Sequence, residues 1–111
     1  MLRLKCNVIN GTSGEIRQKD FAIPESAQIK NKTNTLRYIA RKSGYGDNSL
    51  LDDAIRYEVE VSLSDYLDET RKLLKANGVP GNWGEYGGVS AYFDYACDAA
   101  KAIDAILAIQ Y

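Results

Sequence analysis

The chain reads Leu-Arg-Leu-Lys-Cys-Asn-Val-Ile from residue 2 to residue 9, and apolar and polar side chains alternate along this stretch. A period of two is typical of a half-buried β-strand, because successive side chains of a strand point to opposite faces. The side chains expected to face inward are Leu2, Leu4, Cys6 and Val8. Such a strand leaves an apolar side that another part of the chain must cover.

Turn-forming residues follow this strand directly. Asn10-Gly11 is typical of a hairpin turn, and Ser13-Gly14 extends the loop. A second strand is predicted over residues 15–23, and Pro24 ends it because proline has no backbone N–H to donate to a strand ladder. The chain therefore opens with an antiparallel β-hairpin.

A short helix is predicted from about Asn34 to Lys42, with Thr33 or Asn34 as its N-cap. Its inward side chains are Leu36, Ile39 and Ala40. The sequence Ser-Gly-Tyr-Gly over residues 43–46 ends this helix and offers glycine for a left-handed terminal residue. The next three residues, Asp47, Asn48 and Ser49, are all suitable N-caps for a following helix.

Residues 50–76 fit two periodicities. A 3.6-residue repeat of apolar side chains favours one helix throughout, kinked near Ser62. Residues 57–63 also alternate between apolar and polar, which predicts a third strand followed by a helix over 64–76. We take the continuous helix as the prediction and keep the strand as its alternative.

The last third of the chain holds a loop and a helix. Residues 77–88 contain five glycines and one proline, which indicates a loop. Residues 89–110 are predicted to form a helix that is apolar nearly all round. Such a helix is usually central in a bundle or buried in an oligomer, so we expect self-association through it.

Together these segments predict an α+β fold in one domain, residues 1–111. An N-terminal antiparallel β-hairpin packs against about three helices, of which the last two form an antiparallel helical pair. A chain of this length supports one modest core.

Charge is divided between the two halves of the sequence. Residues 1–46 contain nine Lys or Arg and three Asp or Glu, a net charge of +6, whereas residues 47–111 contain five and twelve, a net charge of −7. This asymmetry concerns partners and self-association rather than fold. No apolar run reaches the roughly 20 residues of a membrane span, and the N-terminus lacks a signal-peptide pattern. We therefore expect a cytoplasmic protein that does not contact a membrane.

The chain contains no histidine, which removes the most common general acid–base residue and the most common transition-metal ligand. The two cysteines, Cys6 and Cys97, match no metal or redox spacing and are interpreted as small buried apolar residues. The aspartates Asp94 and Asp98 flank Lys101 at helical spacing, which is typical of surface ion pairs. We therefore expect no enzyme activity, no cofactor and no metal site.

A basic segment with no acidic residue between Ser26 and Gly46 is the first candidate site. Its cations are Lys30, Lys32, Arg37, Arg41 and Lys42. Arg37 and Arg41 share a helix face, and two tyrosines lie nearby, so the segment predicts binding of phosphate, a nucleotide or nucleic acid. The alternative is a solvated helix face balanced by the acidic half of the chain.

Residues 35–55 run through a helix, a glycine stop at Gly44 and caps at Asn48 and Ser49. In this order they resemble the two helices of a ribbon–helix–helix repressor, and less closely a helix-turn-helix. The resemblance implies a DNA-binding regulator. It departs from both patterns, because polar residues separate the strand from the first helix and Asp47, Asp52 and Asp53 would face DNA phosphates.

Trp83 and Tyr86 lie in the glycine-rich loop and form the second candidate site. Tryptophan and tyrosine often anchor protein interfaces, so this loop predicts a protein partner. The alternative is that Trp83, the only tryptophan, folds back onto the core. The sequence as a whole favours a small binding or inhibitor protein, of the anti-defence or immunity type that phages and other mobile elements encode, with nucleic-acid or nucleotide binding as the alternative.

Overall fold

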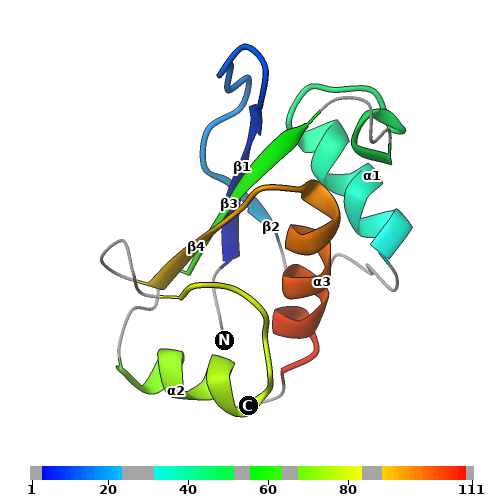
Figure 1. Cartoon of the computed structure of the whole chain (residues 1–111). Helices are drawn as coiled ribbons and strands as arrows, with labels where there is room; N and C mark the ends of the chain where they lie inside the picture. The colour runs from blue at the N-terminus through cyan, green and yellow to red at the C-terminus, as the bar shows by residue number, and fades with distance from the viewer. Residues whose placement is uncertain (1–3, 24–31, 52–55, 64–67, 84–88, 110–111) are drawn as a thin grey trace.

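The computed structural model describes residues 4–23, 32–51, 56–63, 68–83 and 89–109 and has an α+β fold, as predicted. Its elements are β1 (Leu4–Asn10), β2 (Phe21–Ile23), α1 (Lys32–Lys42), the 3-10 turn η1 (Ser49–Leu51), β3 (Tyr57–Leu63), α2 (Asp68–Ala76), β4 (Val89–Phe93) and α3 (Ala96–Leu107). The strands form one antiparallel sheet in the order β2-β1-β3-β4. Helices α1 and α3 lie on the same side of this sheet, and α2 lies at one of its ends (Figure 1).

The first strand is an interior strand of the sheet. β1 pairs with β2 from Leu4↔Ile23 to Cys6↔Phe21, and with β3 over its whole length from Leu4↔Leu63 to Asn10↔Tyr57. Leu4, Cys6 and Val8 are buried, which confirms the face predicted from the alternation. Leu2 lies outside the described residues.

The predicted second strand is too long. Only Phe21–Ile23 forms a strand, and an isolated bridge between Ile9 and Ile16 is the remaining pairing of residues 15–20. The reason is local, because Asp20 has a left-handed backbone with φ of 52° and breaks the extended conformation. Ile16 is 40% exposed instead of facing the core.

The prediction of one helix over residues 50–76 is wrong, and its alternative is confirmed for the residues described. Residues 57–63 form β3, and the helix that follows, α2, begins at Asp68. Tyr57, Val59, Val61 and Leu63 are buried, while the residues between them are only partly covered. The strand keeps both Glu58 and Glu60 out of the core, whereas a continuous helix would bury Glu58 in its apolar stripe.

The predicted helix over 89–110 is also wrong at its start. Residues 89–93 form β4, and α3 begins at Ala96 after an extended Tyr95. Val89, Ala91 and Phe93 are buried in alternation, as in a strand. Val89 and Phe93 lie four positions apart, so these two side chains fit a helical and a strand pattern equally well.

Two helices end in glycines with left-handed backbones. Gly44 (φ 83°) follows α1 and Gly78 (φ 66°) follows α2. In each case the glycine and the next residue donate to helix carbonyls, as Tyr45 N–H does to Ala40 O and Val79 N–H to Leu74 O. Gly44 was the predicted stop. The predicted caps Thr33 and Asn34 are wrong, because they lie inside the helix that begins at Lys32.

Helix α3 lies at the centre of the core. Its six buried side chains are Ala96, Ala99, Ala100, Ala102, Ile103 and Ile106, and the helix packs against α1, β3 and β4. The apolar surface that suggested self-association is thus largely covered within the chain. Self-association stays a prediction that now depends on the charge asymmetry.

A polar contact links α1 and α3. The Thr35 hydroxyl, fully buried, donates a hydrogen bond to Asp104 Oδ1. Burial raises the pKa of Asp104 above its usual value of 3.8, and the hydrogen bond from Thr35 partly offsets this. The charged form of Asp104 is therefore less favourable in the folded protein than in the unfolded chain.

This contact predicts how stability depends on pH. Because the pKa of Asp104 is raised on folding, its contribution to stability is complete below about pH 3.8 and is lost as pH rises through the folded-state pKa. Asp104→Asn keeps an oxygen acceptor for Thr35 but carries no charge. We expect the variant to match the wild type near pH 4 and to be more stable near pH 8 in urea denaturation. Asp98→Asn, on the exposed side of the same helix, is the control, and an equal gain from it would contradict the assignment.

Candidate functional site

A surface hollow of about 510 Å³ lies where β4 turns into α3. Three segments form its walls: residues 80–82, residues 92–95, and the first two turns of α3 at Asp98 and Lys101. None of these walls belongs to the basic segment predicted as a site. The hollow is next to Trp83, which was predicted as a site residue.

Two exposed tyrosines flank this hollow. Tyr92 is 46% exposed and Tyr95 is 55% exposed, and among the described residues only Ile16 is a comparably exposed large apolar side chain. Phe93, between them, points into the core and is buried. The reversal at Tyr95, where the strand ends and the helix begins, places both tyrosines at the same opening.

Trp83 forms the support of one wall. Its ring packs edge-on against Phe93 with 6.3 Å between the ring centroids, and its indole N–H donates to the Pro80 carbonyl at 3.1 Å. Trp83 is half-buried, so it folds back onto the core as the alternative prediction had it and still presents one side to solvent. Tyr86, its predicted companion, lies outside the described residues.

Arg56 contacts two of the residues that line the hollow, Asp94 and Tyr95. Its guanidinium is 3.0 Å from Asp94 Oδ1 and 3.4 Å from Glu58 Oε1, and it lies over the Tyr95 ring at 5.6 Å. Asp94 precedes α3, so the prediction that it lies on the same helix as Asp98 and Lys101 is wrong, and it pairs with Arg56. The rim of the hollow therefore carries charges of both signs.

A smaller hollow of about 270 Å³ lies on the other side of Gly81 and Trp83. Arg71 and Lys75 of α2 line it together with Val79. Arg71 also pairs with Asp68 at 3.4 Å. Gly81 lines both hollows, and Trp83 lines the smaller, basic one.

The structure brings most of the predicted basic segment onto the exposed side of α1. Arg37 donates to Asn48 Oδ1 at 3.2 Å, Arg41 pairs with Asp47 at 3.4 Å, and Lys42 lies 5.7 Å from the Tyr38 ring centroid. Lys32 is exposed, and Lys30 lies outside the described residues. Two residues that follow α1, Asp47 and Asn48, thus contact Arg41 and Arg37.

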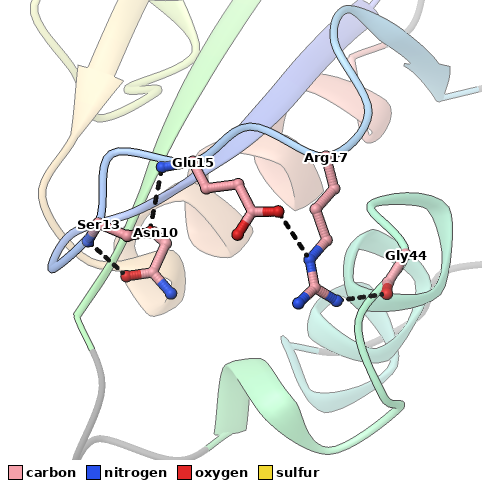
Figure 2. Close-up of polar contacts among 5 residues, drawn as sticks. All are labelled: Asn10, Ser13, Glu15, Arg17 and Gly44. Atoms are coloured by element: carbon pink, nitrogen blue, oxygen red, sulfur yellow. Dashed lines mark hydrogen bonds and ion pairs between the residues drawn. The ribbon is translucent and has the colours of Figure 1, made fainter.

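Arg17 joins this basic surface from the hairpin loop, which sequence reasoning missed. Its guanidinium lies 4.5 Å from the Tyr45 ring centroid, donates to Gly44 O at 3.1 Å and pairs with Glu15 at 3.4 Å. Figure 2 shows this reach from the loop to the end of α1. Burial raises the pKa of Tyr45, and the Arg17 charge partly offsets the rise.

The hairpin loop that carries Arg17 is ordered by its own side chains. Asn10 Oδ1 accepts hydrogen bonds from the backbone N–H groups of Thr12 and Ser13, at 2.9 and 3.1 Å (Figure 2 draws the second). Ser13 Oγ accepts from Glu15 N–H at 3.2 Å. These bonds fix the path of the loop towards α1.

The cysteines are both free. Cys6 is buried in β1, and burial raises the pKa of its thiol, which keeps it protonated. Cys97 is half-buried on α3. Within the described ranges, no three His, Cys, Asp or Glu residues gather in a way that could hold a metal ion. A search of the same ranges finds no helix with the length and apolar character to cross a membrane.

The wall formed by Trp83 depends on Gly81. This glycine has a φ of 132°, and an added Cβ would lie 2.9 Å from both the Phe93 ring and the Trp83 indole nitrogen. We expect Gly81→Ala to displace Trp83, to lower the free energy of unfolding by about 1–3 kcal/mol and to shift tryptophan emission towards the red.

Gly78→Ala is the matched control for this prediction. Gly78 also has a positive φ, of 66°, but an added Cβ would meet no heavy atom within 4 Å. We expect this variant to lose about 1–2 kcal/mol through backbone strain alone, with unchanged tryptophan emission. Equal emission spectra for the two variants would contradict the role of Gly81.

Comparisons of this chain with protein-family models, with curated proteins and with solved structures find no match.

Proposed function

We propose that this protein is a non-enzymatic binding protein, an inhibitor that acts through protein–protein interaction at the hollow between β4 and α3. The observation that carries the proposal is the pair of exposed tyrosines, Tyr92 and Tyr95, at the opening of this hollow. Tyrosine supplies a large contact area with little loss of side-chain entropy, and it is enriched at the centres of interfaces.

The residues around the hollow are held by a strand, a helix and packing contacts, which favours a preorganised binding surface. Tyr92 belongs to a strand, Asp98 and Lys101 belong to a helix, and Trp83 is held by Phe93 and the Pro80 carbonyl. Side chains on rigid elements lose little freedom when a partner binds. A specific interface buries about 1,000 Å² or more, so the hollow serves as its centre and the flanking surfaces as its rim.

The mixed charges around the hollow suit a partner with polar side chains of both signs. Lys101 lines the hollow together with Asp94 and Asp98, and Arg56 pairs with Asp94. We place the protein in the cytoplasm, among the small anti-defence or immunity-type inhibitors that phages and other mobile elements encode. The positive net charge of residues 1–46 and the negative net charge of residues 47–111 support a role in association with a partner.

Alanine substitution tests this proposal after a partner has been captured by cross-linking and purified. Tyr95→Ala removes an exposed ring, and we expect it to weaken binding by about 2 kcal/mol, roughly thirtyfold in Kd, with mild salt dependence. Ile16→Ala, which truncates another exposed apolar side chain that does not line the hollow, is expected to change Kd less than about twofold. If Ile16→Ala weakens binding and Tyr95→Ala does not, the hollow is not the binding surface.

Nucleic-acid or nucleotide binding is the second candidate function. It is favoured by Arg17, which the structure adds to the exposed cations of α1. The ribbon–helix–helix comparison gains no support, because β1 is paired on both sides and has no edge for a second copy's strand. In the helix-turn-helix comparison, the described start of the second helix, Ser49–Leu51, forms the 3-10 turn η1. Nucleic-acid binding by the α1 surface would therefore use a geometry other than that of a ribbon–helix–helix or helix-turn-helix protein.

A gel shift with random duplex DNA separates the two candidates. If the α1 surface binds phosphates, the variant with Arg37→Glu and Arg41→Glu should lose binding, and wild-type affinity should fall steeply with salt. Lys72→Glu together with Lys75→Glu makes the same charge change on α2 and serves as control. Absence of a shift at low salt would leave only the protein-binding proposal.

A further inference from the structure

The smaller hollow, of about 270 Å³, combines a positively charged wall with an apolar one. Arg71 and Lys75 lie four positions apart in α2, on one face of the helix, and they line the hollow together with Val79, Gly81 and Trp83. None of the described residues that line it is acidic. A concave surface lined by charges of one sign concentrates the electric field, so this hollow attracts an anion.

Helix α2 is a basic element in an otherwise acidic half of the chain. Residues 47–111 contain twelve acidic and five basic residues, and three of the basic ones, Arg71, Lys72 and Lys75, lie on α2. Arg71 pairs with Asp68 at 3.4 Å, whereas no carboxylate of the described residues lies within 4.0 Å of the Lys75 nitrogen. Lys75 is therefore the main cation that the hollow offers to a ligand.

The end of α2 is complete without the Lys75 ammonium. Cationic side chains near a helix C-terminus often bond to the last carbonyl groups. Here the carbonyls of Leu73, Leu74 and Lys75 each accept a hydrogen bond from a backbone N–H at 3.1 Å, donated by residues 77, 79 and 78. The turn after α2 thus satisfies these carbonyls, and the Lys75 side chain is not required for that purpose.

Trp83 provides a fixed aromatic surface beside these cations. Its indole N–H donates to the Pro80 carbonyl at 3.1 Å, and its ring packs edge-on against Phe93, with 6.3 Å between the ring centroids. Because the N–H is already bonded, the indole offers a ligand an apolar ring contact and no hydrogen bond. Val79, which is 7% exposed, adds further apolar surface. An aromatic wall next to a cation suits a flat ring that carries a negative charge.

We propose that this hollow binds an aromatic anion, a single planar ring that bears a carboxylate or a phosphate. The ring packs against Trp83 and the anionic group contacts Lys75, while Arg71 adds positive charge from the same helix face. The volume of about 270 Å³ is smaller than the roughly 300–1,000 Å³ of pockets for drug-sized molecules, which suits a ligand of one ring. This binding does not depend on the proposed protein–protein interaction.

Titration of the whole chain with benzoate and with phenyl phosphate tests the proposal. Trp83 is the only tryptophan of the chain, so tryptophan emission reports on this hollow directly. We expect a saturable change in emission with a Kd of about 1–10 mM for the better probe, as is usual for ligands of so few atoms. The NMR signals of the Val79 methyl groups should shift with the same midpoint, because the bound ring lies close to them.

Two further probes separate the contribution of the ring from that of the charge. Benzamide has the ring without the charge, and inorganic phosphate has the charge without the ring. We expect each to bind at least about tenfold more weakly than the better aromatic anion, and the preference between benzoate and phenyl phosphate identifies the anionic group. No saturable change with either aromatic anion up to about 50 mM, or equal binding of benzamide, would overturn the proposal.

Charge variants locate the anion. Lys75→Gln should weaken binding of the better probe by about tenfold, because it removes the main cation of the hollow. Lys72→Gln removes the same charge from the same helix, but Lys72 does not line the hollow, so we expect a change of less than about twofold. Both lysines are exposed, and thermal melting checks that each variant folds. Equal losses from the two variants would indicate general attraction to α2 and refute the assignment.

Discussion

The pairing of β1 with β3 is the constraint on which the rest of the structure depends. It joins residues from opposite halves of the sequence, from Leu4↔Leu63 to Asn10↔Tyr57, and makes these strands the two interior members of the sheet. Their inward side chains, among them Cys6, Val8, Val59 and Val61, are almost completely buried and form the floor on which α3 packs. The same pairing sets Asn7 opposite Glu60 on the open face. Both the core and the contact between Asn7 and Glu60 therefore follow from one register.

The sequence predicts the N-terminal strand and α1 because each has one periodicity and a clear ending. Leu4, Cys6 and Val8 alternate, and Gly44 supplies a left-handed stop after Leu36, Ile39 and Ala40. β3 was predicted only as the alternative to a helix, and β4 was not predicted, because their apolar residues also fit a helical spacing and only pairing with a neighbouring strand decides between the two. Such pairing is a contact between distant segments, and no local pattern contains it.

The candidate sites also contain some residues that local sequence patterns predict and others that they do not. Trp83 could be singled out from its type and its place in a glycine-rich loop, and Arg37 and Arg41 from their helical spacing. The hollow at Tyr92 and Tyr95 could not, because residues 89–110 fit one helix, whereas Tyr92 faces outward through the alternation of β4 and Tyr95 lies in the extended segment before α3. The contact of Arg17 with Gly44 and the hydrogen bonds of Asn7 join segments that are far apart in the sequence, so no local pattern predicts them.

The interior position of β1 has a consequence for synthesis on the ribosome. This strand precedes in sequence both the strands that fill its edges and the helix that covers its face, so it is synthesised before them, and α3 follows all the other described elements. Until β3 emerges, the apolar side chains of residues 4–8 have no interior pairing partner, and until α3 emerges the face of the sheet has no central cover. Pairings between distant segments form slowly because loop closure must precede them. Before β3 and α3 are synthesised, the nascent chain therefore exposes apolar strand surface, and it is in this interval that a chaperone would act.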